Sequence, residues 1–193
     1  METRDRRPEW TPRPFDVLLI DGRSGSGKTS LAARIVRELR GSGGAGSWTG
    51  SEPQLLRVED LYPGWDGLAE GSRALAGALD RGRYRRYDWY AEAFAEEHRI
   101  APRPPLVIEG CGAITAENLA AARRWAERAL PGPVAGGAVR SLWLECPAEL
   151  RRSRALARDG TSYEPHWERW AAQEEAHYAR HEPWFLADEV LRV

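Results

Sequence analysis

The chain has 193 residues, a length that suits one α/β domain, because cores usually divide into separate domains only beyond about 250 residues. Hydrophobic residues make up 42% and charged residues 30%, and 28 basic residues against 29 acidic ones leave a formal net charge of −1. This balance argues against nucleic acid as the main partner and against polybasic attraction to a membrane.

Short apolar segments alternate with amphipathic ones after a charged, proline-rich stretch over residues 1–14, which we expect to be a flexible lead-in. The pattern predicts strands at Phe15–Ile20, Gln54–Val58, Pro105–Glu109, Arg140–Cys146 and Glu189–Val193. It predicts helices at Ser30–Arg40, Leu68–Leu79, Ala91–Arg99, Thr115–Leu130, Pro147–Arg158 and Pro165–His181. This alternation indicates a parallel sheet with helices on both faces, and without a visible boundary we expect one domain over residues 1–193.

The longest clean apolar run, Val17–Ile20, is far shorter than the roughly 20 residues that a membrane-spanning helix needs. The N-terminal stretch lacks the apolar segment of a secretory signal. Two cysteines, Cys111 and Cys146, give no disulfide framework. We therefore expect a cytoplasmic protein without a membrane partner.

The sequence GRSGSGKT at Gly22–Thr29 fits the phosphate-loop pattern G-x-x-x-x-G-K-[ST] and lies between a predicted strand and a predicted helix. In such a loop, glycines let the backbone amides surround a phosphate at the positive end of the helix. Lys28 is the only lysine among the 28 basic residues, and we expect it to reach the outer phosphates while Thr29 binds Mg²⁺. The alternative is a turn that binds nothing. The predicted nucleotide-binding residues are Gly22, Arg23, Ser24, Gly25, Ser26, Gly27, Lys28, Thr29 and Ser30.

A phosphate loop alone does not separate kinases from other nucleotide-binding proteins. The Asn-Lys-x-Asp motif that reads guanine in GTPases cannot exist here, because the only lysine lies in the loop. The chain is too short for a transporter ATPase and has no LSGGQ-like signature.

Several motifs in order resemble the uridine kinase-like group of P-loop nucleoside kinases over roughly residues 16–192. They are the Asp21–Thr29 segment, Glu59-Asp60-Leu61-Tyr62, Tyr87-Asp88-Trp89, Val107-Ile108-Glu109-Gly110, and the arginines 151, 154 and 158. Leu61 and Trp89 depart from the usual residues of that group. The resemblance implies a five-stranded parallel sheet in a three-layer α/β/α sandwich. It also implies ATP and Mg²⁺ as cofactors and a nucleoside such as uridine or cytidine as acceptor.

Two carboxylates follow predicted strands, where open α/β sheets bind their ligands. Asp60 is placed to accept the proton of an attacking hydroxyl, although it could also be a solvated loop residue or a helix cap. Glu109 ends an apolar strand and with Thr29 forms a predicted Mg²⁺ site, the alternative being a salt bridge to an arginine.

Arg151, Arg154 and Arg158 share one helical face and form part of a predicted lid over about 151–164. We expect them to neutralise the transferring phosphoryl group when the lid closes. A solvated basic face is the alternative.

A dense cluster of arginines and aromatic residues occupies Arg81–Tyr90. Tyr87 and Asp88 are predicted to contact the acceptor, and Tyr62 and Trp65 complete the predicted acceptor-binding set with Asp60. A surface hairpin in which arginines stack on tyrosines explains the cluster equally well. For Trp65 the alternative is a partly buried anchor.

His177 and His181 have a metal-binding spacing, but no third ligand is evident, so we do not predict a zinc site. The stripe of Trp167, Trp170, Ala171 and Tyr178 indicates helix packing.

The sequence thus predicts a single-domain kinase that transfers the γ-phosphoryl group of ATP to a hydroxyl of a small molecule. Acceptors other than a nucleoside stay open: a sugar, a vitamin-like nucleoside, an antibiotic or a nucleoside monophosphate. An ATP-binding regulatory protein without transfer activity is a further alternative. The choice between ATP and GTP and the formation of a homo-oligomer stay open as well.

Overall fold

The computed structural model describes residue 10 and residues 13–41, 52–129, 138–160 and 163–193. Five strands form one sheet in the order β2-β5-β1-β6-β7, and every neighbouring pair is parallel. This confirms the predicted five-stranded parallel sheet. The strands are β1 (Val17–Gly22), β2 (Gln54–Arg57), β5 (Leu106–Glu109), β6 (Val139–Glu145) and β7 (Glu189–Arg192). Nearly all of the predicted lead-in, residues 1–9 and 11–12, lies outside the described residues.

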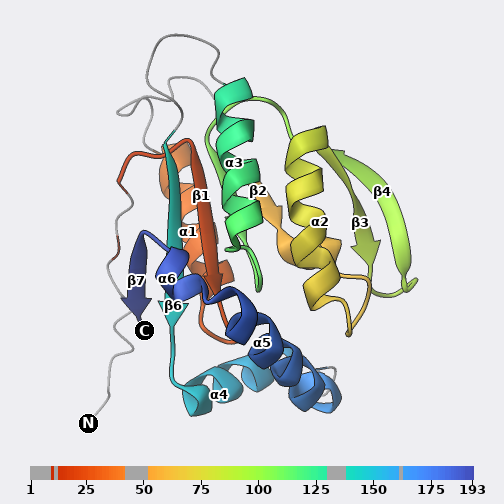
Figure 1. The fold of residues 1–193 in the computed structure, drawn as a ribbon. Helices are drawn as coiled ribbons and strands as arrows, with labels where there is room; N and C mark the ends of the chain where they lie inside the picture. The colour runs from red at the N-terminus through yellow and green to blue at the C-terminus, as the bar shows by residue number, and fades with distance from the viewer. Residues whose placement is uncertain (1–9, 11–12, 42–51, 130–137, 161–162) are drawn as a thin grey trace.

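Helices cover both faces of this sheet (Figure 1). Helix α1 (Lys28–Gly41) packs on one face, and α2 (Leu68–Arg81) and α3 (Ala116–Ala129) pack on the other. Successive side chains of a strand point to opposite faces, so β1 sends Leu18 and Ile20 into the core beneath α1 and Val17 and Leu19 into the larger core on the other side. The three layers follow from this alternation.

Helices α4 (Ala148–Asp159) and α5 (Trp167–His181) lie at the end of the sheet toward which its strands point, and the short α6 (Pro183–Leu186) lies beside β6 (Figure 1). Two 3₁₀ turns are η1 (Val58–Leu61) and η3 (Glu164–His166). No helix in the described ranges is long and apolar enough to cross a membrane.

An antiparallel hairpin stands apart from the main sheet. It consists of β3 (Arg83–Asp88) and β4 (Ala93–Arg99). The prediction of a helix at Ala91–Arg99 is therefore wrong. Most of the Arg81–Tyr90 cluster does lie in a hairpin, where Arg85 bonds to backbone carbonyls and Arg86 to Glu96. Alanine and glutamate favour helix in this segment, but cross-strand pairing, with Tyr84 opposite His98 and Tyr87 opposite Phe94, overrides that local preference.

The carboxyl ends of three central strands meet at one edge of the sheet. β1 runs into the phosphate loop at Gly22, and Arg57 at the end of β2 lies in register with Glu109 at the end of β5. Because parallel strands bring their ends to the same edge, residues far apart in the chain come together there.

Candidate active site

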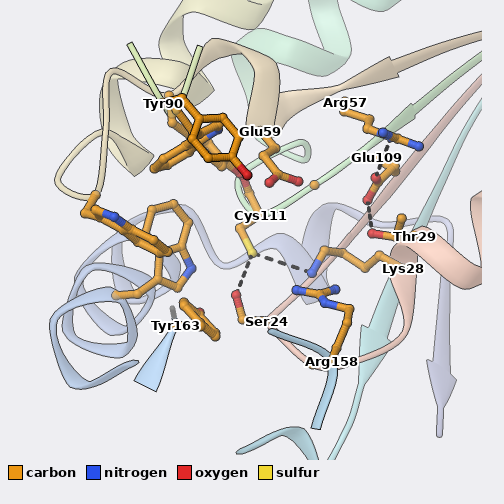
Figure 2. Close-up of a pocket in the computed structure, with 16 residues that line it drawn as sticks. Ser24, Lys28, Thr29, Arg57, Glu59, Tyr90, Glu109, Cys111, Arg158 and Tyr163 are labelled. Carbon is orange, nitrogen blue, oxygen red and sulfur yellow. Dashed lines mark hydrogen bonds and ion pairs between the residues drawn. The ribbon is translucent and has the colours of Figure 1, made fainter. Parts of the chain in front are cut away.

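A cavity of about 680 Å³ opens at this edge of the sheet and extends from the phosphate loop to the β3–β4 hairpin (Figure 2). Cationic, acidic and hydroxyl side chains line one part of it, and aromatic rings line the other. Its lining residues are Ser24, Gly25, Lys28, Thr29, Arg57, Glu59, Tyr62, Trp65, Trp89, Tyr90, Glu109, Gly110, Cys111, Arg158, Tyr163 and Trp170.

The phosphate loop joins β1 to α1 and depends on two glycines. Gly25 has φ +79, and a Cβ there would lie 2.1 Å from the carbonyl oxygen of Arg151, so a side chain cannot be accommodated. Gly27 has φ +96, and the position of its missing Cβ opens onto empty space. The loop therefore encloses an open cradle next to the first turn of α1, whose N–H groups have no partner within the helix. This cradle fits a polyphosphate.

Asp21 holds the loop from behind. Its carboxylate accepts hydrogen bonds from the backbone N–H groups of Gly22 at 2.7 Å, Gly112 at 3.1 Å and Ile114 at 2.8 Å, and from the hydroxyl of Tyr178 at 2.8 Å. Complete burial raises the pKa of Asp21 to about 6 in spite of these hydrogen bonds, which favour the charged form. The residue fastens β1, the segment after β5 and α5 to one another.

Glu174 of α5 supports the loop from a second side. It is 1% exposed and accepts hydrogen bonds from the backbone N–H of Ser24 at 2.6 Å and from the indole of Trp170 at 3.2 Å. Arg151 lies 3.7 Å from its carboxylate and donates to the carbonyl of Ser24 at 3.4 Å. Arg151, one of the predicted lid arginines, is thus buried behind the loop and does not line the cavity.

The other two lid arginines differ from each other in position. Arg154 donates to the thiol sulfur of Cys146 near the beginning of α4, at 3.8 Å, and does not line the cavity. Arg158 does line the cavity, and its guanidinium lies on the side of the Lys28 ammonium (Figure 2). Of the three arginines, Arg158 is therefore the one placed to meet a phosphate in the cradle. Residues 161–162 of the predicted lid lie outside the described ranges.

The Lys28 ammonium lies at the bottom of the cavity. It donates to the carbonyl of Arg23 at 3.1 Å and to the sulfur of Cys111 at 3.5 Å. Burial raises the pKa of the Cys111 thiol to about 12, so this sulfur is a neutral neighbour of the lysine at neutral pH. The charge of Lys28 therefore stays available to a phosphate.

Thr29 and Glu109 lie together as the sequence predicts for a metal site. The Thr29 hydroxyl donates to a carboxylate oxygen of Glu109 at 3.2 Å, and the Nε of Arg57 lies 3.9 Å from the other oxygen. Burial raises the pKa of Glu109 in spite of the nearby charges of Lys28 and Arg57, which favour the ionised form. The ion pair with Arg57 is the alternative that the sequence left open, and it is present beside the contact with Thr29.

This pair of oxygen ligands fits Mg²⁺. The described part of the chain holds no group of three or more His, Cys, Asp or Glu side chains that could bind a metal on its own. A cation at Thr29 and Glu109 would therefore take its other ligands from phosphate oxygens and water.

Two neighbouring carboxylates in η1 point in different directions. Glu59 lines the cavity (Figure 2), whereas Asp60 does not. The Asp60 carboxylate instead accepts a hydrogen bond of 3.4 Å from the hydroxyl of Tyr84 in the hairpin. A 3₁₀ helix has three residues per turn, so consecutive side chains diverge, and the predicted base lies on the hairpin side while its neighbour lies on the cavity side.

Aromatic rings build the opposite part of the cavity. Trp65 is at its centre: its ring stacks on Tyr163 at 5.5 Å, packs against Trp89 at 5.0 Å and meets the edge of Trp170 at 6.4 Å. Tyr62 donates its hydroxyl hydrogen bond to the carbonyl of Cys111 at 2.7 Å. Four separate segments of the chain thus contribute to one aromatic wall.

The predicted acceptor-binding residues are divided by the fold. Tyr62 and Trp65 line the main cavity. Tyr87 lines a smaller neighbouring cavity of about 220 Å³. Asp88 lines neither cavity and accepts hydrogen bonds from the backbone N–H groups of Tyr90 and Ala91, so it shapes the hairpin turn.

The predicted loop residues also take different positions. Ser24, Gly25, Lys28 and Thr29 line the cavity. Ser30 is exposed on α1 outside it, and Arg23 pairs with Glu175 at 2.8 Å. The hydroxyl of Ser26 is buried and has no hydrogen-bond partner among the described residues.

Comparison with solved structures identifies the fold. A possible uridine kinase from Bacillus stearothermophilus superimposes with a TM-score of 0.53 at 18% sequence identity, covering 95% of this chain and 91% of that one. A candidate fructose transport system kinase from Silicibacter gives a TM-score of 0.54, also at 18% identity, covering 94% and 92%. The chain has the fold of the P-loop kinases. No protein-family model and no curated protein sequence matches it.

Sequence reasoning missed several residues of this P-loop kinase fold that contact the cavity or support it. Glu59 was available as the other carboxylate after the second strand, but only the orientation of η1 distinguishes it from Asp60. Trp170 and Glu174 lie one helical turn apart on α5, a spacing that the sequence shows, yet nothing in it indicates that this face meets the phosphate loop. Cys111 follows the Glu109-Gly110 pair and gave no signal of its own.

Proposed function

We propose that the chain is a kinase that transfers the γ-phosphoryl group of ATP to a hydroxyl of a nucleoside, with uridine and cytidine as the first candidates. One observation carries the proposal. A single cavity joins the phosphate-loop residues Lys28 and Thr29 to the carboxylate of Glu59 and to an aromatic wall. The P-loop kinase fold supports it, and a cytoplasmic location, where ATP is supplied, is part of the proposal.

Phosphoryl transfer needs positioning and charge neutralisation more than covalent help from the protein. The acceptor oxygen forms a bond to the γ-phosphorus while the bond from that phosphorus to the bridging oxygen of ADP breaks. Lys28 and Arg158 hold the negative charge of the moving group. Thr29 and Glu109 would hold Mg²⁺, which when bound would neutralise charge on the phosphate oxygens.

Glu59 is the proposed base in place of Asp60. Its carboxylate lines the cavity between the phosphate loop and the aromatic wall, where the acceptor hydroxyl would meet the phosphate. The proton of that hydroxyl passes to Glu59 and afterwards to water. Asp60, bonded to Tyr84, supports the contact between η1 and the hairpin.

The aromatic wall supports a nucleoside acceptor, because a nucleobase is flat and stacks on such rings. A sugar is the second candidate, since one of the two structures of comparable similarity is a candidate fructose transport system kinase.

The proposal is tested by calorimetric titration with a non-hydrolysable ATP analogue and Mg²⁺, followed by coupled measurement of ADP release with a panel of acceptors. We expect nucleotide binding that depends on Mg²⁺, and turnover with uridine or cytidine. Turnover with fructose and not with either nucleoside would move the assignment to a sugar kinase. Absence of nucleotide binding would remove the kinase proposal altogether.

A further inference from the structure

Arg57 is a cation that lies beside the Thr29–Glu109 pair and has no part in the proposed transfer step. It is the last residue of β2 and lies in register with Glu109, the last residue of β5. Leu55 and Val107, two positions earlier in these strands, pack in the core beneath α1. Because side chains two residues apart in a strand share a face, Arg57 and Glu109 both lie on the face that α1 covers, and the first turn of α1 holds Thr29.

The Glu109 carboxylate contacts Thr29 and Arg57 through different oxygens. The Thr29 hydroxyl donates to Oε2 at 3.2 Å, whereas the Nε of Arg57 lies 3.9 Å from Oε1. Figure 2 shows the carboxylate between the two side chains. A separation of 3.9 Å is too long for a hydrogen bond, so the ion pair is held by charge. The Glu109 side chain is 4% exposed and that of Arg57 is 50% exposed, so a fixed anion is paired with a cation that borders solvent.

Positive charge exceeds negative charge around the cavity. The described lining includes three cationic side chains, Lys28, Arg57 and Arg158, and two carboxylates, Glu59 and Glu109. A divalent cation that arrived alone at the metal pair would meet this positive excess and would share the carboxylate with Arg57. The phosphates of a nucleotide remove both penalties, because they bring negative charge and offer the guanidinium another anion.

We propose that Arg57 selects how the metal enters: it keeps free divalent cations off the Thr29–Glu109 pair and admits Mg²⁺ together with a nucleotide. The inference rests on the proposed function in taking this pair as the metal site. Arg57 is thus a counter-charge of Glu109 that the phosphates draw away. A role in which Arg57 only orients the carboxylate predicts the opposite sign, because its loss would then weaken metal binding.

Mn²⁺ tests this inference, because it takes the same oxygen ligands as Mg²⁺ and its paramagnetic resonance signal reports the free ion. Its affinity for the protein without nucleotide is measured for the wild type, Arg57→Ala, Arg57→Lys and Arg83→Ala. Arg83 is the matched control: it is a similarly exposed arginine that lies 3.7 Å from Glu97 in the hairpin, outside the cavity lining. Calorimetry then gives the affinity of each protein for the preformed complex of Mn²⁺ with the non-hydrolysable ATP analogue.

We expect Arg57→Ala to bind Mn²⁺ alone about 10-fold more tightly than the wild type, the order of magnitude for removing one like charge from a site open to solvent. Its affinity for the Mn²⁺–analogue complex should not rise. Arg57→Lys keeps the charge, and Arg83→Ala leaves the site untouched, so both should match the wild type. In the double variant Arg57→Ala/Glu109→Gln the gain should vanish, because the carboxylate that it depends on is neutral.

Four results would overturn the inference. They are an Arg57→Ala variant that binds Mn²⁺ no more tightly than the wild type, undetectable binding to both included; an equal gain in Arg83→Ala; a gain that survives Glu109→Gln; and an equal gain for the Mn²⁺–analogue complex. Thermal melting checks that each variant is folded.

The proposed function fails separately, because phosphoryl transfer is measured by ADP release with an acceptor. If Arg57 controls Mn²⁺ affinity through Glu109 but no transfer occurs, the metal inference stands and the kinase assignment falls. If transfer occurs and Mn²⁺ affinity does not depend on Arg57, the kinase assignment stands and the metal inference falls.

Discussion

The two halves of the cavity, which the proposed function assigns to the phosphates and to the acceptor, are built in different ways. The phosphate half is built around one continuous loop of backbone, held from behind by the buried carboxylates of Asp21 and Glu174. The acceptor half is made of aromatic side chains from distant segments, with the exposed Tyr90 at its mouth. Backbone recognition suits a phosphate, which is the same in every nucleotide, whereas side chains can be exchanged to suit different acceptors.

The carboxylates of η1 lie at the junction of the two halves, and replacing them gives the largest expected effect. Glu59→Gln should lower kcat by about 10²–10⁴, the usual contribution of a general base, without changing nucleotide affinity. Asp60→Asn is the matched control and should cost much less, because that carboxylate faces Tyr84. Steady-state ADP release with uridine measures both. A larger loss in Asp60→Asn would return the base to Asp60 and separate Glu59 from the chemistry.

Within the phosphate half, Lys28→Ala should lower kcat by about 10²–10³, because one preorganised charge next to the transferring group is lost, and should weaken binding of the ATP analogue. The control is Arg40→Ala, which removes an exposed cation from the far end of the same helix. Kinetics and calorimetry on the two variants make the comparison. Unchanged nucleotide affinity in Lys28→Ala would mean that the ammonium does not reach the phosphates.

The buried support of the phosphate half predicts a pH dependence of stability. The pKa of Asp21 is raised from 3.8 to about 6 in the folded protein, so the folded state binds the proton more tightly than the unfolded state. The contribution of this group is therefore largest at low pH and is lost as the pH rises through 6. The free energy of unfolding of the wild type relative to Asp21→Asn should fall by about 2 kcal/mol, a factor of about 50, between pH 4 and pH 7.

Urea denaturation of both proteins at several pH values measures this difference, and the Asp21→Asn variant serves as the reference because an amide side chain does not titrate. A difference that stays constant across the range would show that Asp21 ionises normally in the folded protein. The support of the loop would then be a charged carboxylate held entirely by its hydrogen bonds.

In the acceptor half, Trp65→Ala should raise the KM for uridine about 10-fold, because loss of one stacking partner costs on the order of 1–3 kcal/mol, and should leave nucleotide affinity unchanged. Trp184→Ala is the control, since Trp184 packs against Trp143 away from the cavity. KM values for uridine and ATP, measured on both variants, show whether the two halves act independently. A similar rise in the KM for ATP would mean that the halves are coupled through Tyr163.

The candidate site was predictable where it is local. The phosphate loop, the strand before it and the Thr29–Glu109 pair follow from motif spacing and from the rule that parallel strands end at one edge. The sequence could not resolve the site where neighbours in space decide which side chain lines the cavity. Asp60 and Glu59 are adjacent in sequence and similar in chemistry, so only the turn of η1 determines which one lines the cavity.

The arginines of α4 show the same limit. Arg151 and Arg158 lie on one predicted face, yet one is buried against Glu174 behind the phosphate loop and the other lines the cavity. Their positions depend on where α4 meets the phosphate loop, and the spacing of residues along a helix gives no information on that contact. The helix prediction for Ala91–Arg99 was wrong for a related reason. Pairing with β3, and not the propensity of its own residues, made this segment a strand.

By itself the sequence determined the sheet, its layers and the place of the phosphate loop, since alternating burial and glycine spacing act over a few consecutive residues. Only the tertiary structure decided which carboxylate and which arginine line the cavity and which rings form the aromatic wall. Those choices depend on the packing of segments that lie far apart in the chain, which overrides local preference as it does at Ala91–Arg99.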